Sequence, residues 1–134
     1  MKYKILIVTA DYYRGISNNL LQKAKLFLNN KSIIKIISVP GVFEIPVVIS
    51  KNIKKYDGFV ALGCVIKGET PHFDFISQAS TNAIMNLSIK YKKPISNGII
   101  TCLNKKQAIA RSSNNNKNKG LEASKAVLSV LNNF

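Results

Sequence analysis

The sequence predicts an α/β fold in which a four-stranded parallel sheet lies between layers of helices. Short apolar runs rich in β-branched residues alternate with longer segments whose apolar residues recur at helical spacing. The alternation occurs four times, and strands that alternate with helices in this way form parallel sheets with helices on both faces. No linker or internal repeat interrupts it, so residues 1–134 are expected to form a single domain.

The strands are predicted from apolar runs that end at polar or turn-forming residues. A strand buried on both faces of a parallel sheet has a nearly continuous apolar sequence, and the first run has this character. The second run is stopped by Pro40 and Gly41. The four predicted strands are Tyr3–Ala10, Ile33–Val39, Gly58–Ile66 and Ile95–Leu103.

The helices are predicted from apolar residues spaced three and four apart. Pro46 is compatible with the second helix because it lies in the first turn, where its missing N–H costs little. The Asn-rich run 114–118 before the last helix is expected to be a solvated loop. The predicted helices run from Ile16 to just before Asn29, and at about Phe43–Lys55, Phe73–Tyr91, Lys105–Arg111 and Gly120–Leu131.

The formal net charge of +14 raises the possibility of nucleic-acid binding. However, eighteen of the twenty basic residues are Lys and are dispersed along the chain, whereas Arg occurs twice. Arg is the better reader of phosphates and bases. We therefore expect no specific nucleic-acid partner, only incidental binding of polyanions at low salt.

Cysteine usage and hydropathy indicate a cytoplasmic protein without a metal. Cys64 and Cys102 lie in or beside apolar runs without a C-x-x-C pattern, so two buried thiols are expected. With one histidine and no ligand cluster, a structural zinc site is not expected. No apolar run approaches the roughly 20 residues that span a bilayer. The run after Met1–Lys4 is also too short for a signal peptide, and no membrane association is expected.

Three polar segments follow predicted strands, and ligands of open α/β sheets bind outside the carboxyl ends of the strands. These segments, Asp11–Gly15, Pro40–Glu44 and Lys67–Asp74, should line one common rim. No G-x-G-x-x-G follows the first strand, and no Walker-type phosphate loop occurs. The rim therefore indicates neither a dinucleotide nor a nucleoside triphosphate.

The stretch Gly63–Asp74 predicts an anion site at a helix N-terminus. Thr70 is expected to be the N-cap and Pro71 the first helical residue, which leaves free N–H groups and a dipole that favours negative charge. His72 would lie in that first turn, where a neutral imidazole can transfer protons near pH 7. Asp74 is close enough in sequence to orient the ring. The alternative is that His72 is only a surface or capping residue.

Other candidates carry a structural alternative as well. Glu44 either complements a helix dipole or accepts N–H bonds from a polar heterocycle. Tyr12 is either part of the core or stacks on a ring. Arg111 either makes a bidentate phosphate contact or is a solvated surface residue, and Lys119 lies eight residues later across the Asn-rich run.

Five motifs together resemble lumazine synthase (6,7-dimethyl-8-ribityllumazine synthase), a transferase of riboflavin biosynthesis. They occur in order as PGVFEIP, GCVIKGETPHFD, NGIIT, QAIAR and NKGLEA, over nearly the whole chain from about Ile5. The resemblance implies a flavodoxin-like three-layer α/β/α sandwich without metal or organic cofactor. It also implies the penultimate step of the pathway. In that step, 5-amino-6-(D-ribitylamino)uracil and 3,4-dihydroxy-2-butanone 4-phosphate condense to 6,7-dimethyl-8-(D-ribityl)lumazine, phosphate and water.

The resemblance also implies roles for individual residues. His72 matches the proton-transfer residue, and Glu69, Thr70 and Arg111 would hold the butanone phosphate. Tyr12 takes the place of the aromatic that stacks on the pyrimidine, and Lys119 matches a basic residue near the substrates. The remaining pyrimidine and ribityl contacts would come from Val42, Phe43, Glu44, Cys64, Val65, Ile66 and Asn97.

Asn97 predicts an active site shared between subunits. It lies at the start of the fourth strand, opposite the rim that carries His72, and the family implies sites between neighbouring subunits of a pentamer. Asn97 stands where many members have Phe. The segment Ser112–Asn116 replaces a Gly/Ala-containing turn that accompanies sixty-subunit shells, and the chain begins directly at the first strand. A pentamer or a multiple of pentamers is therefore expected, and these departures favour the pentamer over the shell.

A non-catalytic flavin- or lumazine-binding oligomer of the same fold is the alternative to the synthase. Such a binder has no need of a proton-transfer residue. The joint presence of His72, Glu44, Arg111 and Lys119 therefore favours the enzyme.

Overall fold

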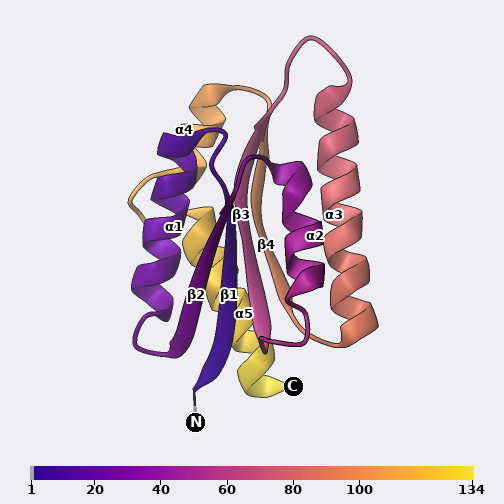
Figure 1. The fold of residues 1–134 in the computed structure, drawn as a ribbon. Helices are drawn as coiled ribbons and strands as arrows, with labels where there is room; N and C mark the ends of the chain where they lie inside the picture. The colour runs from indigo at the N-terminus through magenta and orange to yellow at the C-terminus, as the bar shows by residue number, and fades with distance from the viewer. Residues whose placement is uncertain (1) are drawn as a thin grey trace.

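The computed structural model describes residues 2–134 as a four-stranded sheet between two layers of helices (Figure 1). All strand pairs are parallel, and the strands lie in the order β2-β1-β3-β4. The predicted three-layer α/β/α, flavodoxin-like sandwich is thus confirmed. The strands are β1 (Tyr3–Ala10), β2 (Ser32–Val39), β3 (Gly58–Ile66) and β4 (Ile95–Cys102).

The helices divide between the two faces of the sheet. On one face lie α1 (Arg14–Leu28), α4 (Lys105–Ser112) and α5 (Lys119–Asn133). The 3-10 helix η1 (Val42–Glu44), α2 (Ile45–Lys51) and α3 (His72–Tyr91) cover the other. None of the helices in residues 2–134 combines the length and apolarity needed to cross a membrane.

Successive residues of each central strand enter different cores. Ile5 and Ile7 of β1 pack toward α1 and α5, and Leu6 and Val8 pack toward α2 and α3. All four are fully buried, because side chains alternate between the two faces of a strand and both faces are covered. This explains why the strand sequences are continuous apolar runs.

One predicted helix end is wrong, and one predicted loop is right only in part. The second helix ends at Lys51, not Lys55, because Asn52 closes it. The Asn52 backbone N–H donates to the Ile49 carbonyl (3.0 Å) and its side-chain amide donates to the Val48 carbonyl (2.8 Å). The Asn-rich run is not solvated throughout, because Asn118 at its end is fully buried.

A glycine sets the approach between α1 and α5. A Cβ at Gly120 would overlap the backbone carbonyl of Leu20, which has no flexible end that can move away. Gly15, near the start of α1, has open space around its Cα instead. Gly120 therefore lets the first turn of α5 rest directly on the backbone of α1.

We predict that Gly120→Ala lowers the free energy of unfolding by about 1–3 kcal/mol or more, because the added methyl group forces two helices apart. Gly15→Ala is the matched control and should be neutral or stabilising by up to about 1 kcal/mol. Urea unfolding followed by circular dichroism measures both. Equal midpoints for Gly120→Ala and the unmodified protein would contradict the close packing.

Candidate active site

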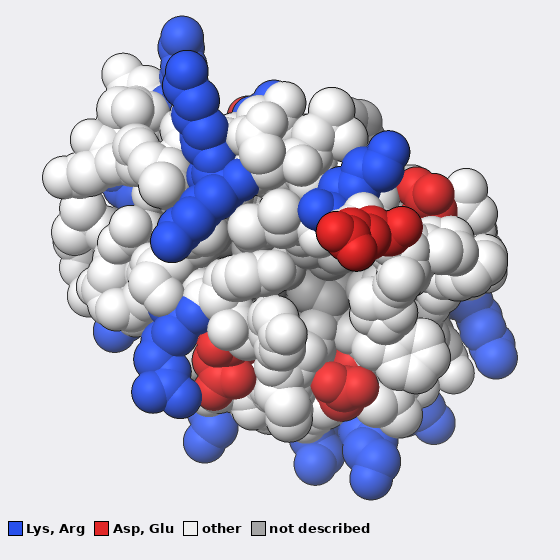
Figure 2. Space-filling view, turned by 90° about the horizontal axis from the view of Figure 1, so that it is seen from above, with Lys and Arg blue, Asp and Glu red and all other residues white. Residues whose placement is uncertain are grey.

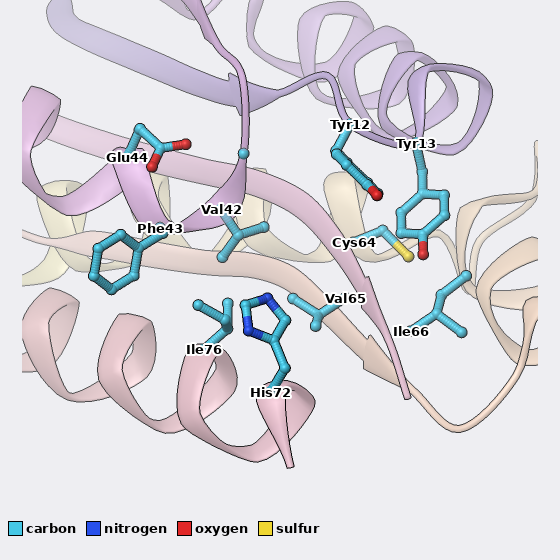
Figure 3. A pocket seen from close by; sticks show the side chains of 11 residues that line it. Tyr12, Tyr13, Val42, Phe43, Glu44, Cys64, Val65, Ile66, His72 and Ile76 are labelled. Carbon is cyan, nitrogen blue, oxygen red and sulfur yellow. The ribbon is translucent and has the colours of Figure 1, made fainter. Parts of the chain in front are cut away.

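A cavity of about 490 Å³ opens at the carboxyl ends of β1 and β3 (Figure 3). These neighbouring strands lie where the strand order reverses, since the chain runs from β1 outward to β2 and from β3 outward to β4. Such a switch point is the usual ligand site of an open α/β sheet. The cavity is lined by Tyr12, Tyr13, Gly41, Val42, Phe43, Glu44, Cys64, Val65, Ile66, His72 and Ile76.

Glycines bring η1 over the end of β3. A Cβ at Gly63 would lie 2.8 Å from Cγ2 of Val42 and 3.2 Å from Cβ of Ala10, so a larger residue would displace η1. A Cβ at Gly41 would lie 3.0 Å from Oε1 of Glu44. Because Gly63 and Gly41 have no side chains, Val42 is buried against β3, and the Glu44 carboxylate lies half-buried beside the Gly41 backbone.

His72 projects from the first turn of α3 into the cavity, beside Val65 and Ile76 (Figure 3). The helix begins at His72, and Pro71 occupies the N-cap, so the predicted register of Thr70 as N-cap is shifted by one residue. The Thr70 hydroxyl still accepts from the His72 backbone N–H at 3.4 Å. The hydrogen bonds of residues 2–134 include none between His72 and Asp74, so this chain alone does not provide the expected orienting contact.

Aromatic rings border the cavity at both ends. Tyr12 is 75% exposed and contacts Tyr13 edge to face, with the ring centroids 5.0 Å apart. Phe43 is also exposed and lies with Glu44 at the opposite end from the two tyrosines (Figure 3). Burial, with smaller contributions from Tyr12 and Cys64, raises the pKa of the Tyr13 phenol. The exposed rings leave flat apolar surfaces available to a planar ligand.

The two cysteines are free thiols in the sheet, as expected. Burial, followed by the nearby Cys102 thiol, raises the pKa of Cys64 to about 12. Burial also raises the pKa of Cys102, while the guanidinium of Arg111 acts in the opposite direction. A thiol with so high a pKa stays protonated near neutrality and is a poor nucleophile. Cys64 therefore forms part of the cavity wall.

The rim of the cavity is electrostatically mixed despite the excess of lysine. Four of the six carboxylates, those of Asp11, Glu44, Glu69 and Asp74, lie in the three polar segments beyond the strand ends. A view onto the carboxyl ends of the strands shows acidic side chains among basic ones (Figure 2). No group of three or more metal-ligating side chains occurs in residues 2–134. This arrangement favours a small polar ligand over a long polyanion.

Comparison with known proteins assigns the chain to a family. A sequence model of the 6,7-dimethyl-8-ribityllumazine synthase family matches residues 2–134. The chain belongs to this family. Among named relatives, the 6,7-dimethyl-8-ribityllumazine synthase of Bartonella henselae is 46% identical over 97% of this chain and 87% of its own length. The protein of the same name from Agrobacterium fabrum is 41% identical over 97% and 93%.

Eight of the residues expected from the lumazine synthase resemblance line the cavity together, namely Tyr12, Val42, Phe43, Glu44, Cys64, Val65, Ile66 and His72. Glu69 and Thr70 lie exposed in the loop just before α3. The other three expected residues do not line the cavity of their own chain.

Asn97, Arg111 and Lys119 each have local partners instead. Asn97 is the third residue of β4, at the end of the strand remote from the cavity, and its side-chain oxygen accepts from the Ile99 N–H (3.0 Å). Arg111 donates to the Gln107 carbonyl (3.2 Å) in the last turn of α4. Lys119 begins α5 and pairs with Glu122 at 3.0 Å.

Tyr13, Gly41 and Ile76 also line the cavity but were not among the residues expected to bind substrate, although Tyr13 and Gly41 belong to polar segments expected at the rim. Ile76 follows His72 by four residues, so helical spacing alone places both side chains on one face of α3. Tyr13 directly precedes α1, where the chain turns too sharply for strand alternation to apply. Gly41 has no side chain and contributes backbone, which a search for functional side chains does not detect.

Proposed function

We propose that the cavity between β1 and β3 is the active site of a lumazine synthase. There the chain condenses 5-amino-6-(D-ribitylamino)uracil with 3,4-dihydroxy-2-butanone 4-phosphate to 6,7-dimethyl-8-(D-ribityl)lumazine, with release of phosphate and water. The observation that carries this proposal is that eight separately expected residues, from four segments of the chain, line one cavity. Membership of the family supplies the reaction.

The pyrimidine lies against the apolar walls of the cavity. Val42 and Val65 are buried on the wall, and the exposed ring of Tyr12 covers one face of the heterocycle. Glu44 accepts N–H groups of the ring or hydroxyls of the ribityl chain, a role that suits a half-buried carboxylate with no cation bound to it in residues 2–134. The backbone at the end of β3 supplies further donors and acceptors.

The phosphate lies at the N-terminus of α3. This helix has 20 residues, and among residues 2–134 the only side-chain hydrogen bond to its first turn is the 3.4 Å contact between Thr70 and the His72 N–H. The N–H groups that follow and the helix dipole are therefore available to an anion. Thr70 adds a hydroxyl and Glu69 an acceptor for the substrate hydroxyls. Arg111 supplies the cation that stabilises phosphate as it leaves.

His72 transfers protons during the condensation. Imine formation and loss of water and phosphate each require proton transfer, and a positioned general acid–base contributes about 10²–10⁴ in rate. The imidazole is exposed within the cavity, between the phosphate region and the ring region. Holding both substrates in one cavity supplies a further entropic advantage.

The site is completed by a second copy of the chain. Asn97, Arg111 and Lys119 lie outside the cavity of their own chain, and exposed apolar side chains on α2 and α3 offer a surface for another subunit. These side chains include Val47, Phe75, Met85 and Ile89. We infer a homopentamer, or a multiple of pentamers, in the cytoplasm, where reduced buried thiols are stable.

The activity is tested by mixing the two substrates with the protein and following lumazine absorbance and phosphate release. We expect His72→Ala to reduce kcat by about 10²–10⁴ while the assembly is retained. Lys90→Ala, at the far end of the same helix, is the control and should keep the wild-type rate. An unchanged rate in His72→Ala would remove the assigned role. Absence of product with the wild-type protein would favour a non-catalytic binder.

Arg111→Ala should raise the KM for the butanone phosphate by about ten- to hundredfold, because a charged hydrogen bond to phosphate is lost. The KM for the pyrimidine substrate should change little. Arg111→Lys should be intermediate, since an ammonium keeps the charge but not the bidentate geometry. Lys106→Ala on the same helix is the control. Equal rises in both KM values would argue against a phosphate contact.

Activity should depend on assembly, because residues of two chains form each site. Analytical ultracentrifugation of the wild-type protein should show a pentamer or a multiple of it, and monomers obtained by dilution or by Phe75→Glu should be inactive. Leu26→Glu, an exposed apolar position on α1, is a control outside the proposed interface. A fully active monomer would overturn the shared site.

A further inference from the structure

One buried carboxamide closes the turn between α4 and α5. Asn118 is 0% exposed, although Asn114, Asn115 and Asn116 just before it are all exposed. A polar side chain removed from water must have hydrogen-bond partners, and a carboxamide needs both donors and acceptors around it. The partners of Asn118 lie on three different helices.

The amide nitrogen of Asn118 binds the end of α4. Its Nδ2 donates to the carbonyls of Ser112 and Ser113, each at 3.0 Å, and a more distant contact of 3.4 Å reaches the carbonyl of Asn19 in α1. Carbonyls at the C-terminus of a helix have no partner within it. The Asn118 amide therefore fixes the last turn of α4, whose final two residues are Arg111 and Ser112.

The carbonyl oxygen of the same side chain binds the start of α5. Its Oδ1 accepts from the backbone N–H groups of Gly120 at 2.8 Å and Leu121 at 3.2 Å. Asn118 is thus the N-cap of α5, and Lys119 is the first residue of the helix. The absence of a Cβ at Gly120 lets the first turn of α5 lie on the Leu20 carbonyl of α1, the same helix whose Asn19 carbonyl the Asn118 amide contacts.

We propose that Asn118 is a positioning residue for the reaction, which sets Arg111 and Lys119 in a fixed relation to each other. Arg111 directly precedes Ser112, whose carbonyl accepts from Nδ2, and Lys119 directly follows Asn118. This inference rests on the proposed function, in which both cations serve the substrates.

A helix cap alone does not account for this side chain. Capping α5 requires only an oxygen, and Asp or Ser supplies one equally well. The nitrogen donates no hydrogen bond to α5, and its partners are Ser112 in α4, the C-cap residue Ser113 and Asn19 in α1. Only the carboxamide joins the end of one helix to the start of the next, so the nitrogen is the part of the side chain that the test must remove.

The test separates the two halves of the carboxamide in the assembled enzyme. Asn118→Asp keeps the oxygen that caps α5 but replaces the donating Nδ2 with a second oxygen. This oxygen repels the Ser112 and Ser113 carbonyls, so the end of α4 should shift. We expect the KM for the butanone phosphate to rise about tenfold, from the loss of a buried donor. We expect kcat to stay within about threefold. In the Arg111→Ala background, Asn118→Asp should raise this KM no further, because it acts through Arg111.

Controls distinguish positioning from stability. Asn116→Ala, exposed on the same loop, should leave both constants unchanged. Asn118→Ser keeps a capping oxygen and introduces no charge, so it replaces Asn118→Asp if that variant does not fold. A folded Asn118 variant with a lowered unfolding midpoint but an unchanged KM would overturn positioning. If Arg111→Ala itself left the KM unchanged, the phosphate role of Arg111 would fail, and the positioning proposal with it.

Discussion

The reversal of strand order between β1 and β3 is the constraint on which the rest of the structure depends. Connections between parallel strands are right-handed, so the direction of each step along the sheet decides which face its helix covers. The step from β1 to β2 places α1 on one face, and the opposite steps to β3 and β4 place α2 and α3 on the other. At the carboxyl ends of the strands, the chain therefore leaves toward α1 on one face and toward η1 on the other. The cavity occupies the space between these two segments.

The same architecture explains how so basic a chain keeps carboxylates at its ligand site. In a parallel α/β fold every crossover helix ends near the amino ends of the strands. Lysines in the last turns of α1, α2 and α3 complement the helix dipoles there. The rim instead receives acidic residues in first turns, Glu44 and Asp74 among them. Net charge is thus a poor guide to the cavity, because helix direction distributes the charges unevenly.

Sequence predicted the central strands β1 and β3 well because both of their faces are buried, which demands apolar residues at most positions. The predicted bounds of β1 and β3 agree with the structure, and those of β2 and β4 differ by one residue. Helix ends were predicted less well, since a single side chain can decide them, as Asn52 does for α2. The cavity residues were expected chiefly through the resemblance. The strand-end argument had also placed three polar segments at one rim, and residue chemistry had indicated the first turn of α3.

Asn118 shows where composition misleads. A run of asparagines is typical of solvated loops, and four of its five positions are exposed. Whether an Asn is buried depends on whether free helix-end carbonyls and N–H groups converge on it, and that convergence is a property of the packing of α1, α4 and α5. Only the Asn118–Gly120 pair, an N-capping residue followed by a glycine just inside a helix, could have indicated a close approach in advance.

If Asn97 contacts substrate, its position in β4 decides which parts of the site come from one chain and which from another. β4 pairs with β3 in parallel register from Phe59 opposite Ile95 to Ile66 opposite Cys102, so it cannot slide without breaking the whole ladder. Asn97 precedes the end of β4 by five residues, which at about 3.3 Å per residue places it about 16 Å from the rim. Since β4 is the edge strand and Asn97 is exposed on it, the proposed site between two copies is the arrangement that brings this residue to a cavity.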